Sequence, residues 1–166
     1  GEIIQDKQMY KAARDEADYY ARIQKKTADF LEICCELGAL VGGMDAAAVA
    51  KLAAYGHAIG MAFQITDDLL DILETSEQIG KPAGNDIRQG IVTLPVLRAL
   101  AVSPAMTDEM VARALAIVRA TDGAAFAQAK AEAYLSRAKA VLPEELPEDI
   151  RDAYEQVADF IGQRNF

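Results

Sequence analysis

Residues 46–73 read AAAVAKLAAYGHAIGMAFQITDDLLDIL, and they form the most apolar long segment of the 166-residue chain. Apolar residues fall on nearly every side of a helix with 3.6 residues per turn, which is typical of a helix buried in a bundle. Asp45 precedes the segment and is a favourable N-cap residue. The sequence therefore predicts one long, mostly buried helix over residues 46–73.

A polar stripe interrupts this apolar helix. Its members are separated by three or four residues and share one face: His57, Gly60, Gln64, Asp67, Asp68 and Asp71. Carboxylates on adjacent turns lie about 5–6 Å apart, and two such charges repel by about 3 kcal/mol at an effective dielectric constant near 20. The C-terminal end of a helix dipole also disfavours negative charge. No Lys or Arg occurs between Lys51 and Lys81, so no cation lies nearby in the sequence.

The crowded carboxylates indicate a positive partner. A basic residue elsewhere in the fold could supply it, and a solvated acidic face is the ordinary interpretation of a charge cluster. The apolar surroundings favour a hard cation instead, because Mg²⁺ prefers oxygen ligands and keeps water or substrate phosphates on its other positions. We therefore predict an Mg²⁺ site that handles a diphosphate, formed by Asp67, Asp68 and Asp71.

Composition narrows the class of protein. The hydrophobic fraction is 52%, and 17 Lys and Arg against 26 Asp and Glu give a formal net charge of −9. This balance argues against binding of nucleic acid, which requires a basic surface. No charge-free apolar run approaches the ~18 residues of a membrane span, so we expect no transmembrane segment. The adjacent Cys34 and Cys35 are expected to be buried free thiols, consistent with the cytoplasm.

The rest of the chain shows helical periodicity and no two-residue alternation. Residues 18–40 are expected to form one amphipathic helix, whose apolar face comprises Tyr20, Ile23, Thr27, Phe30, Leu31, Cys34 and Leu37. Residues 75–93 are predicted to be a loop because they contain several Gly and a Pro. Further helices are predicted over residues 94–101, with Thr93 as cap, and over residues 107–120, 123–141 and 147–163. The predicted fold class is an all-α helical bundle.

Several motifs together resemble a known family. They are FQITDDLLD at residues 63–71, Gly80-Lys81, GNDIRQGIVTLP at residues 84–95 and Lys26-Thr27. Their order and spacing resemble the second aspartate-rich region of the trans-isoprenyl (polyprenyl) diphosphate synthases. The flanking Gly1-Glu2 with Gln5, and Arg164-Asn165 in the last helix, also fit. The resemblance covers residues 1–166, as the C-terminal portion of a polyprenyl synthetase domain with the isoprenoid synthase fold.

The resemblance implies a transferase of isoprenoid biosynthesis. Such enzymes condense isopentenyl diphosphate with an allylic prenyl diphosphate to make a longer polyprenyl diphosphate. Two aspartate-rich helices face each other across a deep cavity, and three Mg²⁺ ions bridge them to the allylic diphosphate. The full-length enzyme is expected to be a homodimer in the cytoplasm.

The resemblance also implies roles for single residues. Asp67 would bind Mg²⁺ directly, with Asp68 and Asp71 helping directly or through water. The catalytic residues would be Lys26 and Lys81, which contact the departing diphosphate, and Thr27 and Gln64, whose oxygen dipoles steady the carbocation. Phe63 would line the pocket of the growing chain. We leave His57 out as a hydrogen-bonded packing residue, and Asp86 either caps a turn or reaches the metal shell.

Two departures from the family pattern matter. Ile91 stands where many members have a Lys, so one diphosphate contact is missing or is replaced by Arg88, which hints at the longer-chain synthases. The first aspartate-rich motif and the basic residues that bind isopentenyl diphosphate belong to the family's N-terminal half and are absent. We therefore expect this chain to be inactive alone.

Two alternative functions remain open. A class I terpene cyclase shares the fold and metals, but its second metal motif is usually of an Asn/Ser/Glu type, so DDLLD argues against it. A non-catalytic partner subunit or helical interaction module of a prenyl synthase is the other alternative. Neither product chain length nor the preferred allylic primer follows from the sequence.

Overall fold

The computed structural model describes residues 15–73, 84–102 and 111–163, and over these ranges the chain forms helices and no strand. The helices are α2 (Glu16–Ile23), η1 (Gln24–Ala28), α3 (Asp29–Val41), α4 (Ala46–Leu73), α6 (Asn85–Arg88), α7 (Leu94–Val102), α8 (Val111–Ala120), α9 (Gly123–Ala140) and α10 (Glu148–Gly162). The predicted all-α fold class is confirmed.

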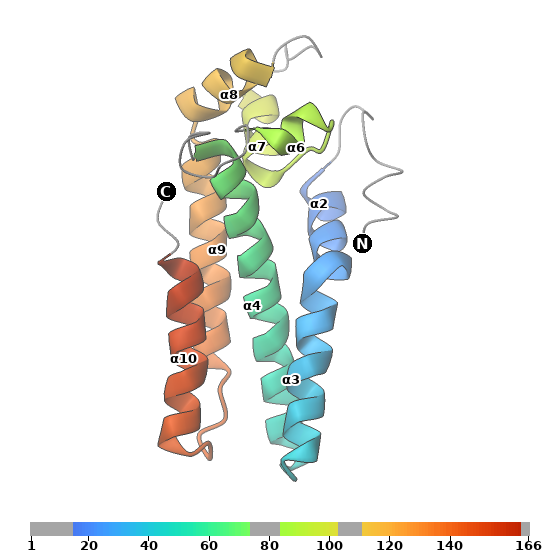
Figure 1. Cartoon of the computed structure of the whole chain (residues 1–166), viewed down its shortest axis with the longest axis vertical. Helices are drawn as coiled ribbons and strands as arrows, with labels where there is room; N and C mark the ends of the chain where they lie inside the picture. Colours follow the sequence, from blue (N-terminus) through green and yellow to red (C-terminus); the bar gives the residue numbers. More distant parts are fainter. Residues whose placement is uncertain (1–14, 74–83, 103–110, 164–166) are drawn as a thin grey trace.

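The long helices pack side by side with α4 in the middle. Figure 1 shows α4 between α3 on one side and α9 on the other, with α10 against α9. The short helices α6, α7 and α8 gather at the end of the molecule where α4 terminates. The carboxylates at the end of α4 therefore lie among the short helices.

The central helix α4 has the bounds that the sequence predicts. The side chain of Asp45 caps its start, since the Ala48 backbone N–H donates to Asp45 Oδ1 at 2.8 Å. At the other end, the Arg119 guanidinium donates two hydrogen bonds to the Ile72 carbonyl, at 3.0 and 2.6 Å. The positive charge of Arg119 interacts favourably with the negative end of the α4 dipole, which is also the end that carries the aspartates.

The side chains of α4 fill two of the hydrophobic clusters of the core. Leu52 is 1% exposed in one cluster, and Ile65 and Leu69 are fully buried in the other. By length and composition α4 could cross a membrane, with a mean hydropathy of 1.2 over its most apolar window. However, 56% of that window is buried inside the structure, as in the core helix of a bundle.

Two glycines bring α4 into backbone contact with η1 and α3. A Cβ atom on Gly60 would lie 2.5 Å from Ala28 Cα, and one on Gly56 would lie 2.4 Å from the Leu31 carbonyl oxygen. Only glycine permits so close an approach without a shift of one helix. Because Ala28 is the last residue of η1, this contact fixes the π-helical turn against α4.

The helix expected over residues 18–40 differs from the prediction in two ways. It begins at Glu16 and contains the π-helical turn η1, which local periodicity does not reveal. Its expected apolar face is also split, because Ile23 is buried whereas Phe30 and Leu37 are 67% and 54% exposed. The apolar residues of α3 therefore lie on two sides of the helix, and α4 covers one of them.

Three smaller predictions also fail. The predicted loop over residues 75–93 contains the single-turn helix α6. The Thr93 hydroxyl is buried and has no hydrogen-bond partner among the described residues, so Thr93 does not cap α7 through its side chain. Cys34 is a free thiol as expected, but it is exposed and not buried, while Cys35 is half-buried. Lys81 and the terminal motif residues lie outside the described residues.

We predict that Gly60→Ala lowers the free energy of unfolding by about 1–3 kcal/mol, because the new Cβ overlaps the Ala28 backbone. Gly38→Ala is the matched control, since a Cβ there meets nothing within 4 Å. It should gain about 0.5–1 kcal/mol from the lower entropy of the unfolded chain. Urea unfolding measures both. Equal gains in the two variants would contradict the close helix contact.

Candidate functional site

Four carboxylates gather where α4 ends. Asp67 is exposed and Asp68 and Asp71 are half-buried on α4, and the half-buried Asp86 joins them from α6. Burial, together with the negative charges of Asp71 and Asp67, raises the pKa of Asp86 to about 6. The three aspartates of the predicted stripe therefore form one cluster with Asp86.

Asp68 has the most strongly raised pKa that is described in this cluster. Burial raises its pKa to about 7, with a further contribution from the charge of Asp86. The Tyr19 hydroxyl donates a hydrogen bond to Asp68 Oδ2 at 2.8 Å, which favours the charged carboxylate. Burial and Asp68 together raise the pKa of Tyr19 well above its usual value, so Tyr19 stays a donor.

Arg22 supplies a buried positive charge beside the carboxylates. It is only 4% exposed, and it donates to the Val92 carbonyl at 2.7 Å. Its guanidinium carbon lies 5.4 Å from the centre of the Tyr19 ring. The charge of Arg22 lowers the pKa values of both Asp68 and Asp86. One basic residue from elsewhere in the fold thus partly compensates the cluster, but both pKa values remain raised.

The sequence prediction missed Tyr19 and Arg22, although a signal for them exists. Positions 19, 22 and 26 are separated by three and four residues, so a helix places them on the face that carries Lys26. Both residues lie inside the helix predicted over residues 18–40, but that prediction followed the apolar face of the helix and did not extend the face of Lys26 back to them.

Asp71 orders the segment that carries Asp86. Its two carboxylate oxygens accept hydrogen bonds from the backbone N–H groups of Asn85 and Asp86, each at 3.0 Å. Its carbonyl accepts from the Gly84 N–H at 2.8 Å. Gly84 adopts a φ of 73°, the left-handed conformation that glycine tolerates. Since a carboxylate has about four lone-pair sites, Asp71 can hold α6 and still offer an oxygen to a cation.

The remaining predicted site residues lie along the same two helices. Lys26 is exposed on η1 and close enough to Asp86 to lower its pKa, and Thr27 is half-buried beside it. π-Helical turns inside α-helices are frequent at functional sites. On α4, Gln64 is 4% exposed and Phe63 is half-buried against the core. Ile91, at the expected Lys position, is buried, and Arg88 is exposed.

The donor chemistry of this cluster fits a hard divalent cation. Its four carboxylates supply only oxygen ligands, as Mg²⁺ and Ca²⁺ prefer. The pKa values of Asp68 and Asp86 are raised first by burial and then by the neighbouring carboxylates, so their charged forms lack a positive partner that a cation would supply. With Lys26 at the edge, the arrangement can attract both a divalent cation and an anion such as a diphosphate.

Comparisons with known proteins agree with this geometry. A family model described as polyprenyl synthetase matches residues 1–133. The chain is 38% identical over 176 residues to heptaprenyl diphosphate synthase component 2 of Geobacillus stearothermophilus, covering 100% of this chain and 55% of that protein. It is also 38% identical over 141 residues to geranylgeranyl diphosphate synthase of Mycobacterium tuberculosis, covering 76% and 40%. The chain thus spans about half the length of the curated relatives it matches.

Solved structures show the same fold. Heptaprenyl diphosphate synthase from Staphylococcus aureus is 30% identical with a TM-score of 0.92, over 99% of this chain and 55% of that one. Polyprenyl synthase from Caulobacter crescentus, complexed with calcium and isoprenyl diphosphate, is 32% identical with a TM-score of 0.87, over 99% and 55%. The predicted isoprenoid synthase fold is confirmed.

We predict that the metal-free protein loses stability as pH rises from about 5 to about 8. The folded-state pKa values of Asp68 and Asp86 lie above the unfolded value of 3.8, so the folded state binds more protons in this range. The free energy of unfolding in EDTA should fall by on the order of 2 kcal/mol. Urea unfolding measures it, with Asp68→Asn as the variant that reduces the change. A rise in stability over this range would contradict the described cluster.

We further predict that Tyr19→Phe raises the pKa of Asp68, because it removes the hydrogen bond that favours the carboxylate. Carbon-detected NMR of Asp side chains across a pH series measures that titration. Tyr20→Phe is the matched control, since Tyr20 is the adjacent, half-buried residue and packs edge-on against the Tyr19 ring. An unchanged Asp68 titration in Tyr19→Phe would show that this hydrogen bond does not tune the cluster.

Proposed function

The chain belongs to the polyprenyl synthetase family, and from this premise we propose that it forms the metal-binding, diphosphate-ionising part of an Mg²⁺-dependent polyprenyl diphosphate synthase. Such an enzyme condenses isopentenyl diphosphate with an allylic prenyl diphosphate. The observation that carries the proposal is the cluster of four carboxylates at the end of α4, with Lys26 beside it.

The proposed reaction begins at the allylic substrate. Its C1–O bond breaks, and the electron pair leaves with the diphosphate. The double bond of isopentenyl diphosphate then supplies the electrons of the new C–C bond to C1, and loss of a proton forms the new double bond. The barrier depends on stabilising the charge that develops on the departing diphosphate.

The residues of this chain would act around that step. Asp67, Asp68, Asp71 and Asp86 would hold the Mg²⁺ ions. When bound, Mg²⁺ supplies positive charge to the diphosphate oxygens. Lys26, and Lys81 by resemblance, would attract the same group. The crystallised Caulobacter crescentus relative, complexed with calcium and isoprenyl diphosphate, supports a site of this kind.

Other residues would shape the carbocation region. The oxygen dipoles of Thr27 and Gln64 would favour an allylic cation without forming a bond to it. Phe63 would line the pocket of the extending prenyl chain. The support is their position, because Thr27 lies beside Lys26 and the two α4 residues lie within one or two turns before the aspartates.

We propose that turnover needs residues beyond these 166, which supply the first aspartate-rich motif and the isopentenyl diphosphate site. An exposed apolar face on α3 supports this proposal: Phe30, Ile33, Leu37 and Leu40 are each more than half exposed, at 67%, 51%, 54% and 53%. Apolar patches of this kind mark surfaces that another element or chain covers. The assembled enzyme would be a homodimer in the cytoplasm.

A non-catalytic partner subunit is the second candidate. Two relatives carry the name "component 2", which denotes one component of an enzyme that has more than one. In this alternative the aspartates would serve assembly instead of turnover.

Asp67→Asn with Asp71→Asn distinguishes the two candidates, with Asp152→Asn on the exposed face of α10 as control. The assay is incorporation of labelled isopentenyl diphosphate by the protein at its natural length, with its partner where it has one. We expect the double variant to lose roughly 100-fold or more in activity and the control to keep it. Full activity with weakened assembly would favour the partner role, and steady turnover by residues 1–166 alone would contradict the requirement for further residues.

A further inference from the structure

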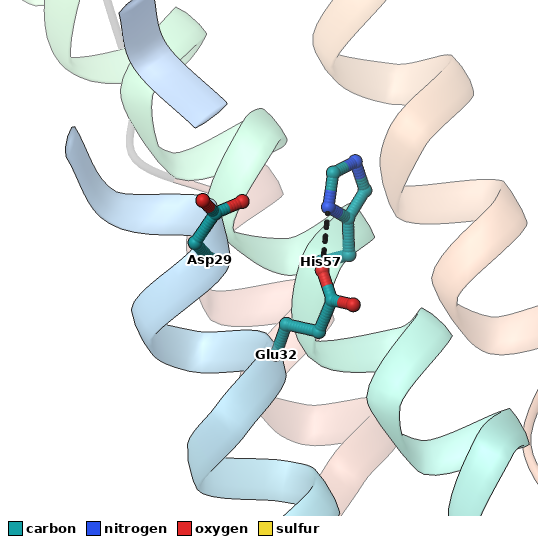
Figure 2. Close-up of side chains that lie close together, drawn as sticks. All are labelled: Asp29, Glu32 and His57. Carbon is teal, nitrogen blue, oxygen red and sulfur yellow. Dashed lines mark hydrogen bonds and ion pairs between the residues drawn. The ribbon is translucent and has the colours of Figure 1, made fainter. Parts of the chain in front are cut away.

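A second cluster of metal-ligating side chains lies where α3 and α4 cross. It consists of Asp29 and Glu32 on α3 and His57 on α4, and one ligand atom from each residue lies within 4.8 Å of the other two. Figure 2 shows Glu32 and His57 paired, with His57 Nδ1 3.0 Å from Glu32 Oε2, and Asp29 beside them on α3. His57 precedes Asp67 by ten positions, about 15 Å along the helix. The cluster is therefore separate from the aspartates at the end of α4.

The backbone holds these residues in a fixed relation. Asp29 and Glu32 are three positions apart on α3, so they share a face. His57 lies between Gly56 and Gly60, where the backbone of α4 closely approaches α3 and η1, respectively. Because those contacts are at the backbone, they fix the spacing of the helix backbones here, and the carboxylates and the imidazole can change their separation only by side-chain rotation.

The donor set differs from that of the aspartate cluster. It combines one imidazole nitrogen with two carboxylate oxygens, which suits Zn²⁺ and related transition metals better than Mg²⁺. Three protein ligands with an open fourth position are characteristic of reactive or exchangeable zinc sites. Ligand atoms about 2.0–2.2 Å from a tetrahedral ion lie about 3.4 Å from one another. The three ligand atoms here lie within 4.8 Å of one another, so small side-chain rotations would bring them to that spacing.

We propose that Asp29, Glu32 and His57 form a binding site for a divalent transition metal, with Zn²⁺ as the preferred ion, that joins α3 to α4. All three side chains are half-buried, so an ion can reach them from solvent. The site leaves the proposed Mg²⁺ ligands untouched and adds a second, chemically distinct metal to the protein.

The surrounding charges leave the site open to a cation. Lys25 pairs with Asp29 Oδ2 at 2.7 Å, and this pair lowers the pKa of the Asp29 carboxyl, so the ligand is already ionised at neutral pH. The side chain of Lys25 is 56% exposed, and solvent screens such a pair, so an incoming divalent ion can displace it. Glu32 has His57 as its hydrogen-bonding partner, and His57 would become a fellow ligand.

A bound ion would have a structural consequence. Asp29 directly follows η1, the π-helical turn that carries Lys26 and Thr27. A metal joining Asp29 to α4 would hold this turn in its place beside the aspartate cluster. The ion would thus stabilise the fold and the position of Lys26 without taking part in the chemistry.

The test is Zn²⁺ titration calorimetry on the metal-free protein at its natural length, with saturating Mg²⁺ present to fill the aspartate cluster. We expect one Zn²⁺ per chain and a higher melting temperature when it binds. His57→Gln and Glu32→Gln should each weaken Zn²⁺ binding at least 10-fold. Both substitutions are conservative, so the test still stands if one of the two variants fails to fold. Glu36→Gln, an exposed carboxylate one turn along α3, is the control that should bind as the wild type does.

The outcomes separate the proposal from its alternatives. Absence of Zn²⁺ binding would overturn it and leave His57 and Glu32 as an ordinary hydrogen-bonded pair. Unchanged binding in both His57→Gln and Glu32→Gln would also overturn it. Loss of the ion in Cys34→Ser or in Asp67→Asn, with His57 intact, would place the metal on the exposed thiol or in the aspartate cluster. Tetrahedral absorption bands of Co²⁺ that vanish in His57→Gln would support it.

Discussion

The mutual repulsion of carboxylates at the end of a buried helix is the constraint on which the rest of this structure depends. Asp68 and Asp86 have raised pKa values because burial removes water and each faces further carboxylates. The surrounding groups reduce that repulsion only in part. The Tyr19 hydroxyl donates a hydrogen bond to Asp68, and backbone N–H groups of α6 donate to Asp71. The positive charge of Arg22 lowers the pKa values of Asp68 and Asp86. Negative charge remains uncompensated in the cluster, and a divalent cation that also binds a diphosphate would neutralise it.

The close contact of α3 with α4 makes this arrangement possible. Gly56 and Gly60 allow the two backbones to touch, and this contact fixes η1 beside α4. Lys26 then lies near enough to Asp86 to influence its pKa, although 60 positions separate them in the sequence. The same contact creates the crossing at which Asp29, Glu32 and His57 meet, so one packing feature serves both proposed metal sites.

The sequence alone predicted those features that local patterns determine. The bounds of α4 follow from its apolar periodicity and from the Asp45 cap, and the carboxylate stripe follows from three- and four-residue spacing. Features that depend on tertiary contacts were missed. The partners of Asp68 come from a helix 49 and 46 positions earlier, and Asp71 acts as a cap only because α6 folds back onto it. The exposure of Phe30 and Leu37 on α3 could not be predicted, because apolar periodicity does not say which element covers a face.

The measurement that tests the central claim most directly is the number of protons released when Mg²⁺ binds at about pH 6.5. Calorimetry in two buffers of different ionisation enthalpy gives this number, because metal binding to a protonated carboxyl must release its proton. Our account predicts net proton release that diminishes in Asp68→Asn, since the pKa values of Asp68 and Asp86 are about 7 and about 6. Binding of Mg²⁺ without proton release would show that the ion does not contact these carboxyls, and it would contradict the account.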